Sequence, residues 1–117
     1  MAAQDKLTLL QGTLDMLILK SLLTGARHGY GITHWIQATS NDVLTVEDGS
    51  LYPALHRIER RGWITAEWGP SESNRRAKFY SLTRTGKAQL TREIDSWEAL
   101  VQGISLVLQA RPQEAGS

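Results

Sequence analysis

The stretch DGSLYPALHRIERRGW, residues 48–63, decides how this chain folds. Leu51, Leu55 and Ile58 are spaced four and three residues apart, which places them in one apolar stripe along a helix. At about 100° per residue, the other side of that helix carries Pro53, His56, Arg57 and Arg60. We therefore expect a helix whose apolar side packs on a core and whose opposite side presents basic groups to an anionic partner.

Residues with strong positional preferences mark the ends of this helix. Asp48 or Ser50 can accept hydrogen bonds from free N–H groups of the first turn. Pro53 then falls in or beside that turn, where a missing N–H costs least. Gly62 supplies the left-handed conformation that commonly ends a helix. The sequence thus predicts a helix that begins near residue 48 and stops at Gly62.

The segment before this helix predicts a second, shorter one that follows His28 and Gly29. Ile32, Trp35 and Ile36 give it a buried side. It should end in the cluster of turn formers at residues 40–42, and residues 43–46 then form an extended link or one short strand. Two short helices with a compact connection, the second carrying the basic groups, match a helix-turn-helix arrangement.

After Gly62 the hydrophobic period changes from that of a helix to that of a strand. Residues 63–68 and 77–82 are rich in aromatic and β-branched residues, and the turn-rich loop GPSESNRR, residues 69–76, separates them. A hairpin directly after a recognition-type helix is the wing of a winged helix. Its tip and returning strand carry Arg75, Arg76 and Lys78, which would reach phosphates or a minor groove.

The first helix is predicted within LTLLQGTLDMLILKSLLTG, residues 7–25. Thr13 is expected to cap it, Asp15 to lie in its first turn and Gly25 to stop it. Apolar residues cover most of its circumference, and one small chain could hardly bury both faces. Two interpretations remain open: a helix shared between its own domain and a partner subunit, or a central core helix.

The last helix is predicted from Arg84 to about Ala110, with Thr83 as its cap. Its apolar residues are spaced 4, 3, 4, 3 and 4 apart: Leu90, Ile94, Trp97, Val101, Ile104 and Leu108. This is a heptad pattern, which indicates pairing between helices, most simply between two copies of the chain. Gly103 either allows a close approach of two backbones or is simply tolerated.

Charge is distributed unevenly along the 117 residues, although the net charge is only +1. Residues 57–87 hold eight Lys and Arg against three Asp and Glu, whereas the remainder holds five against nine. One basic face on a mildly acidic body is common in nucleic-acid binders. With 41% hydrophobic residues, the chain has the composition of one small globular domain.

Several classes of protein are excluded by the sequence. The chain has no cysteine, so disulfides, thiolate metal sites and thiol catalysis are ruled out. Its three histidines lack the spacing of a metal site, and neither a nucleophile-elbow motif nor a phosphate-binding P-loop is present. We expect no enzymatic activity, no metal and no cofactor. The leucine-rich run at residues 7–23 is interrupted by polar residues, so we expect no signal peptide, no membrane span and a cytoplasmic location.

Four motifs together resemble the PadR family of bacterial winged-helix transcriptional regulators. They are QGTLDMLILKSLL, HGYGI, DGSLYPALHRIERRGWI and RRAKFYSLTRTGKAQL, and the similarity covers roughly residues 7–108. The single C-terminal helix resembles the short subgroup. The resemblance implies a mainly α fold with a small β-hairpin (α+β). A winged helix-turn-helix domain would span residues 1–83, a dimerisation helix residues 84–110 and a flexible tail residues 111–117.

The resemblance also implies a function. Such regulators are homodimers held by the first and last helices, bind a roughly palindromic operator and usually repress transcription. The residues implied to contact DNA are Ser50, Tyr52, Pro53, His56, Arg57, Arg60, Arg75, Arg76 and Lys78. Alternatives remain open at two places. Tyr52 could instead pack against the wing, and Arg60 and Arg61 could be a solvated pair that favours the helix C-terminus.

Some members of the family bind planar aromatic or cationic compounds between their last helices. In this chain two copies of Trp97 could sandwich such an effector, with Ile94 and Val101 beside them. Plain interface packing by Trp97 is the alternative. For the whole protein, the alternative is a dimeric effector-binding or protein-interaction module that does not bind DNA.

Overall fold

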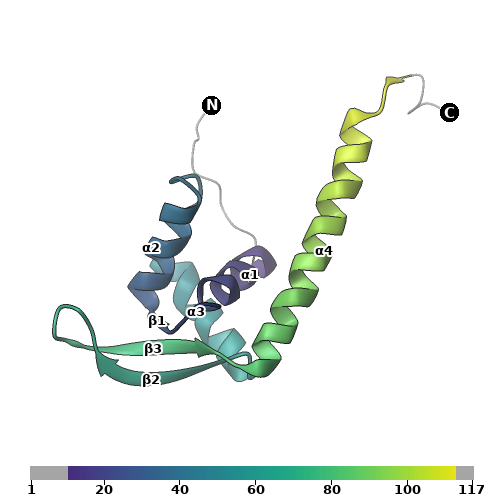
Figure 1. Ribbon diagram of the computed structural model, residues 1–117. Helices are drawn as coiled ribbons and strands as arrows, with labels where there is room; N and C mark the ends of the chain where they lie inside the picture. Colours follow the sequence, from purple (N-terminus) through teal and green to yellow (C-terminus); the bar gives the residue numbers. More distant parts are fainter. Residues whose placement is uncertain (1–10, 113–117) are drawn as a thin grey trace.

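The computed structural model describes residues 11–112 of the chain (Figure 1). The parts of the predicted first helix and tail that fall on residues 1–10 and 113–117 lie outside the described residues. The elements in chain order are α1 (Gln11–Ser21), β1 (Arg27–His28), α2 (Gly29–Thr39), α3 (Asp48–Arg60), β2 (Ile64–Pro70), β3 (Arg76–Leu82) and α4 (Arg84–Gln109). This order and the three-stranded sheet form a winged helix followed by one long helix, which confirms the expected mainly α fold with a β-hairpin.

The core is centred on α1, which packs against α2, α3 and α4. Ile18 and Leu19 of α1 are completely buried, and so are Leu51 and Ile58 of α3. The expectation that one chain cannot bury both faces of the first helix is wrong for most of its length, because Met16 is also buried within the single chain. Within the described residues, α1 is therefore mainly a core helix of its own domain.

The predicted ends of α1 are also wrong. Gln11 and Gly12 are already helical, so Thr13 lies inside the helix and does not cap it. Asp15 lies beyond the first turn, and the helix ends at Ser21, four residues before Gly25. Sequence reasoning failed here because no residue at this point breaks a helix by itself, and Leu22, directly after the helix, is still buried in the core.

The helix-turn-helix follows the sequence closely. The Nδ1 atom of His28 accepts a hydrogen bond from the N–H of Gly31 at 3.0 Å and so caps α2. Ser40 is the C-cap of α2, and the next two residues, Asn41 and Asp42, have φ angles of 52° and 66°. Asn and Asp are the non-glycine residues that best tolerate this left-handed conformation. The predicted turn at residues 40–42 is confirmed.

The buried side of α3 is the one that its apolar spacing predicts, because Leu51, Leu55 and Ile58 are all buried. The N-terminus differs from expectation. Glu47 is the N-cap and its side chain makes no capping hydrogen bond. Pro53 lies inside the helix, beyond the first turn, where it cannot donate to the carbonyl of Gly49. Gly62 ends the segment with a φ of 80°, as predicted.

The sheet has one strand that the sequence did not suggest. The strand order is β1-β3-β2, with both pairs antiparallel. β2 and β3 are the expected wing, and they pair from Ile64 with Leu82 to Pro70 with Arg76. β1 is only two residues long, and Arg27 pairs with Tyr80. Such a strand is too short to leave a periodic pattern, yet it holds the base of the wing against the start of α2.

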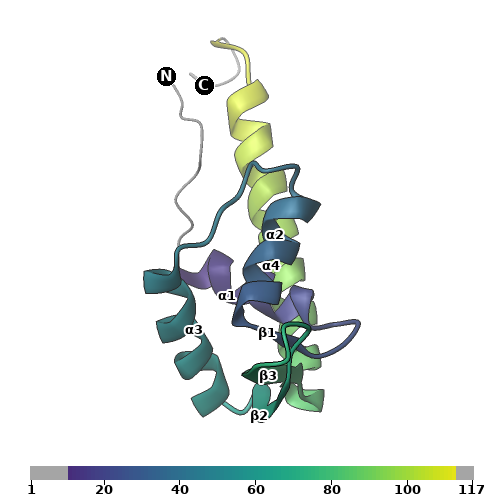
Figure 2. The same ribbon diagram turned by 90° about the vertical axis from the view of Figure 1, so that its left-hand side faces the viewer.

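The final helix begins as predicted, with Thr83 Oγ1 accepting from the N–H of Gly86 at 3.0 Å. Figures 1 and 2 show that α4 then extends away from the wing and the helix-turn-helix, so that its far half stands clear of them. Leu90 is buried in the core. The later heptad residues are exposed in the single chain: Trp97, Val101, Ile104 and Leu108. From Trp97 onward, the apolar stripe of α4 is therefore exposed to solvent in the single chain.

Candidate nucleic-acid interface

The exposed side of α3 carries most of the residues predicted to contact DNA. Ser50, Tyr52, Pro53, His56 and Arg60 are all exposed. Pro53, His56 and Arg60 lie opposite the buried stripe of α3, and Ser50 and Tyr52 lie at the two edges of the exposed side. The structure brings these five residues together on one helix face.

Arg57 is placed differently. Its Nη2 atom donates a hydrogen bond to Asp15 Oδ1 at 2.6 Å, and the two side chains are only 23% and 11% exposed. The Nε of Arg57 is buried and has no hydrogen-bond partner among the described residues. The expected orientation toward the DNA groove is therefore not what the structure has, because Asp15 of α1 holds the guanidinium against the body of the protein. Sequence spacing placed Arg57 on the basic side but could not detect a carboxylate 42 residues away.

The tip of the wing, residues 71–75, is a tight hydrogen-bonded turn. The N–H of Ser71 donates to the carbonyl of Arg75 at 2.8 Å, and the N–H of Asn74 donates to the carbonyl of Ser71 at 2.9 Å. Asn74 has a φ of 65°, which asparagine tolerates better than most residues. The turn therefore fixes the backbone from which the exposed residues Arg75 and Arg76 project.

The wing tip is linked to the start of α2 by one side-chain contact. His28 Nε2 lies 3.2 Å from Glu72 Oε1. Because Nδ1 of the same ring accepts from Gly31, Nε2 carries the proton in the neutral ring and donates it to Glu72. The pKa of Glu72 is lowered by a hydrogen bond from its own backbone N–H, and further by the hydrogen bond and charge of His28. His28 thus connects two elements that contribute to the candidate interface.

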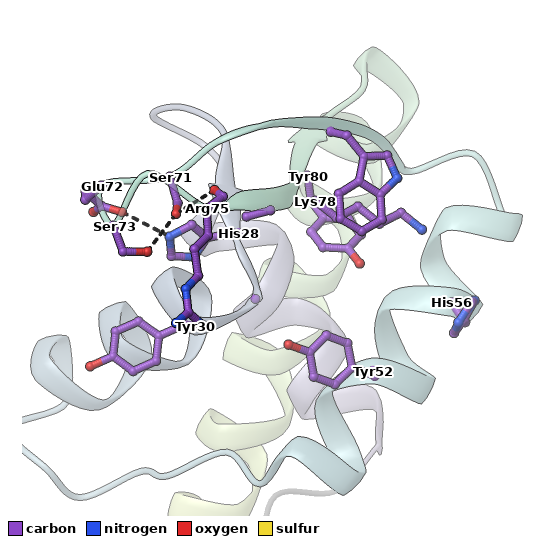
Figure 3. Close-up of a pocket in the computed structure, with 13 residues that line it drawn as sticks. His28, Tyr30, Tyr52, His56, Ser71, Glu72, Ser73, Arg75, Lys78 and Tyr80 are labelled. Carbon is purple, nitrogen blue, oxygen red and sulfur yellow. Dashed lines mark hydrogen bonds and ion pairs between the residues drawn. The ribbon is translucent and has the colours of Figure 1, made fainter.

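A cleft of about 800 Å³ lies between the wing, the start of α2 and the exposed side of α3 (Figure 3). We call it the α3–wing cleft. It is lined by His28, Gly29, Tyr30, Tyr52, His56, Trp68, Ser71, Glu72, Ser73, Arg75, Ala77, Lys78 and Tyr80. Four of the predicted DNA-contacting residues are among these. The cleft therefore joins the predicted contacts of the helix with those of the wing.

Tyr52 forms one wall of the α3–wing cleft. Its ring lies so close to Gly29 that a Cβ atom there would come within 2.6 Å of the Tyr52 hydroxyl oxygen. The side chain is nevertheless exposed along part of its surface. Tyr52 therefore packs against the N-terminus of α2, and it shares the cleft with the wing residue Tyr80. This contact positions Tyr52 and still leaves it accessible.

Sequence reasoning missed three aromatic residues of the cleft: Tyr30, Trp68 and Tyr80. The signal for two of them was available. In the wing, Trp68 is paired with Lys78, so strand alternation puts it on the same face as that predicted contact. Tyr80 lies two residues from Lys78 and belongs to the same face. Only the register of the hairpin was needed to find them.

The predicted effector residues lie elsewhere. Trp97 and Val101 are exposed on α4 and Ile94 is half-buried. A separate cavity of about 610 Å³ lies between α1 and α4, and Trp97 and Leu100 form part of its lining. Ile94 and Val101 do not line this cavity. The single chain therefore brings only Trp97 of the three predicted residues to a cavity.

Metal-binding clusters and membrane-spanning helices are both absent from residues 11–112. Within that range no group of three or more His, Cys, Asp or Glu side chains is arranged to hold a metal ion. None of the described helices is long and apolar enough to cross a membrane.

Known proteins with related sequences or folds support one family. A protein of Lysinibacillus sphaericus is 29% identical over 101 residues, which is 86% of this chain and 93% of that protein. A transcriptional regulator of Clostridium thermocellum has a solved structure with a TM-score of 0.74 and 27% identity, covering 81% of this chain and 92% of that one. A PadR-like transcriptional regulator of Bacillus cereus superposes with a TM-score of 0.73 and 25% identity, covering 86% of this chain and 96% of that one. The model of the transcriptional regulator PadR-like family matches residues 18–92, and the chain belongs to this family.

Proposed function

We propose that this regulator binds a palindromic operator in duplex DNA as a homodimer and represses transcription there. The observation that carries the proposal is the α3–wing cleft, where exposed residues of α3 and basic residues of the wing share one surface. A helix that enters the major groove and a wing that contacts the flanking backbone need this arrangement. A repressor then acts by occupying DNA that the transcription machinery requires.

Within this proposal the contacts divide into two kinds. Ser50, Pro53 and His56 lie on the exposed side of α3 and would face base edges in the major groove. Arg60, Arg75, Arg76 and Lys78 would neutralise phosphates, which fixes position without reading sequence. Arg57 is assigned a supporting role at most, because its guanidinium is already bonded to Asp15.

Dimerisation is proposed to occur through α4, with a smaller contribution from the start of α1. Trp97, Val101 and Ile104 are exposed at heptad spacing, and burial against a second copy would remove this apolar surface from water. A two-fold dimer presents two equivalent α3 helices, which matches a palindromic site. The recognition helices would then lie about one DNA turn apart, roughly 34 Å.

An effector is proposed to act at the dimer interface. Trp97 is the central residue, because it belongs both to the exposed stripe of α4 and to the cavity beside α1. A planar aromatic or cationic compound could stack on it. Such a compound would release DNA only if it binds more tightly to a dimer whose recognition helices are wrongly spaced.

DNA binding can be measured by fluorescence anisotropy with the DNA upstream of the protein's own gene. Unrelated DNA serves as competitor, and the salt concentration is varied. We expect preferential binding that weakens steeply with salt, by a slope of about 0.9 for each neutralised phosphate. Absence of binding to either DNA at low salt would contradict the proposed function and favour a dimeric interaction module that does not bind DNA.

A further inference from the structure

The wing presents one continuous face to the α3–wing cleft. Along this face Ala66 pairs with Tyr80 and Trp68 pairs with Lys78. Nearer the core the same face carries Ile64, which is buried. The face therefore changes along the wing, from core packing at its base to an open aromatic and basic surface further out.

Tyr80 has a hydroxyl group that the described part of the protein leaves without a hydrogen bond. The residue is only 5% exposed, but its side chain lines the cleft. Figure 3 shows Tyr80 pointing from the wing toward the space above Tyr52. Burial raises the pKa of Tyr80, and the nearby Glu59 and Tyr52 raise it further, so the hydroxyl keeps its proton at neutral pH. The Tyr80 hydroxyl is not among the buried unpaired atoms of the described residues, so it reaches the surface of the cleft and is available there to an acceptor.

Trp68 supplies an apolar wall beside that donor. Its side chain is 57% exposed although it is one of the largest apolar groups of the chain. The guanidinium carbon of Arg76 lies 5.9 Å from its ring centre, and Lys78 Nζ lies 5.9 Å from the ring centre of Tyr80. The cleft thus combines exposed aromatic surface with positive charge.

The charges around the cleft favour an anionic occupant. Arg75 and Lys78 are the cationic side chains that line it. Glu72 is the one acidic residue in the lining, and its carboxylate is bonded to His28. An occupant with both a negative group and an apolar group would match this surface, and the sugar–phosphate backbone of DNA has both.

We propose that one strand of the DNA passes through the α3–wing cleft, with a phosphate bound by the Tyr80 hydroxyl and Lys78 Nζ and a deoxyribose packed on Trp68. The inference rests on the proposed function, since it requires that the protein bind DNA. It adds two uncharged residues to the proposed DNA contacts: Tyr80 donates a hydrogen bond, and Trp68 provides apolar packing. The backbone lies between the major groove, which α3 enters, and the groove next to the wing.

The test uses hydroxyl and ring deletions in the full chain and a random-sequence duplex of about 30 base pairs, because a phosphate contact does not depend on base sequence. Tyr80→Phe removes only the hydroxyl, and Trp68→Leu removes an exposed ring. Thr91→Val is the matched control, since it also removes a hydroxyl but lies on α4, outside the cleft lining. Lys78→Met removes a charge from the same face.

We expect Tyr80→Phe to weaken DNA binding about tenfold, as for other hydrogen bonds to charged groups. Trp68→Leu should weaken it about fivefold because less apolar surface is buried against the sugar, and Trp68→Phe should weaken it less. All three variants should keep the salt slope of the wild type because no charge is removed. Lys78→Met should instead reduce the slope by about 0.9 for each phosphate that is no longer neutralised. Thr91→Val should bind as the wild type does.

The outcomes separate two failures. If the wild-type chain does not bind the duplex at low salt, the proposed function is wrong. If it binds and neither Tyr80→Phe nor Trp68→Leu changes the affinity, only the path of the strand through the cleft is overturned. A second measurement avoids reliance on folding of the variants: with 5-fluorotryptophan in the wild-type chain, the ¹⁹F resonance of Trp68, assigned with Trp68→Phe, should shift on saturation with DNA. An unshifted Trp68 resonance would also overturn the inference.

Discussion

Arg57 of α3 donates a hydrogen bond to Asp15 of α1 over 2.6 Å, and this contact ties α3 to the core helix that the other helices touch. The pair is mostly buried, so each charge depends on the other. The sequence pattern predicts that Arg57 contacts DNA, but in the structure Arg57 helps to hold α3 against α1.

Asp15→Ala should lower the free energy of unfolding by about 2 kcal/mol, because it leaves the Arg57 guanidinium partly buried without its acceptor. Chemical denaturation at fixed protein concentration measures this decrease. Asp95→Ala, an exposed carboxylate on α4, is the matched control and should cost little. In a double-mutant cycle, Asp15→Ala should have little effect on stability when Arg57 is already Met, which would show that the Arg57–Asp15 pair causes the decrease. Equal stability of Asp15→Ala and the wild type would contradict this interpretation.

Two glycines of α4 should respond in opposite ways to alanine. At Gly86 a Cβ atom would overlap the carbonyl of Trp63, so Gly86→Ala should destabilise the protein by about 2 kcal/mol or more. At Gly103, apart from its neighbours and the nearby backbone of α4, no atom of residues 11–112 lies within 4 Å of a Cβ, so Gly103→Ala should stabilise the helix by about 1 kcal/mol. Thermal unfolding monitored by circular dichroism compares the two. A decrease in stability in Gly103→Ala would indicate that a partner backbone approaches there.

These contacts show how far the sequence predicts the structure. The buried stripe of α3, the turn at Asn41 and Asp42 and the capping by Thr83 are local features, and each was predicted from neighbouring residues. The strand β1 and the Arg57–Asp15 pair depend on residues more than 40 positions apart, which no local period reveals. The candidate site shows the same difference between local and long-range features. The sequence predicts the contacts of the helix and of the wing separately, but it does not predict the cleft that joins them.

The link between His28 and Glu72 should be visible in a pH titration of the wing tip. The pKa of Glu72 in the folded protein lies below its ordinary value of 4.5. The interactions that lower this pKa, first the backbone N–H of Glu72 and then His28, therefore stabilise the fold at pH values above the unfolded pKa, and this contribution is lost as pH falls through the folded pKa. Because Glu72 is fully exposed, the change should be local and should be followed by NMR of its carboxyl carbon.

His28→Asn separates the two contacts of His28, since asparagine also caps helices but cannot reach Glu72 in the same way. The titration midpoint of Glu72 should rise toward 4.5 in this variant without reaching it, because the lowering by the backbone N–H of Glu72 remains. An identical midpoint in His28→Asn and wild type would show that His28 does not act on Glu72.

The heptad stripe of α4 should determine the oligomeric state. Ile104→Glu places a charge in the stripe and should convert the proposed dimer to a monomer at micromolar concentration, because an unpaired charge is costly to bury. Leu106→Glu is the matched control: Leu106 is more exposed than Ile104, at 66% against 49%, but lies off the stripe. Sedimentation velocity measures both variants. If both variants are monomeric, the substitutions disrupt α4 in general. If both variants are dimeric, the interface lies elsewhere.

The wing arginines should affect DNA binding without affecting dimerisation. Arg75 at the wing tip and Arg76 at the start of β3 are both exposed, so Arg75→Ala with Arg76→Ala should leave folding and dimerisation intact. Removing two charges should reduce the salt slope of DNA binding by about 0.9 for each phosphate that the wing no longer neutralises. Arg84→Ala with Arg92→Ala is charge-matched, and both residues are exposed on α4, outside the cleft lining. Anisotropy titrations of the two double variants therefore distinguish wing contact from net charge, since a purely electrostatic effect of net charge would reduce the slope equally in both.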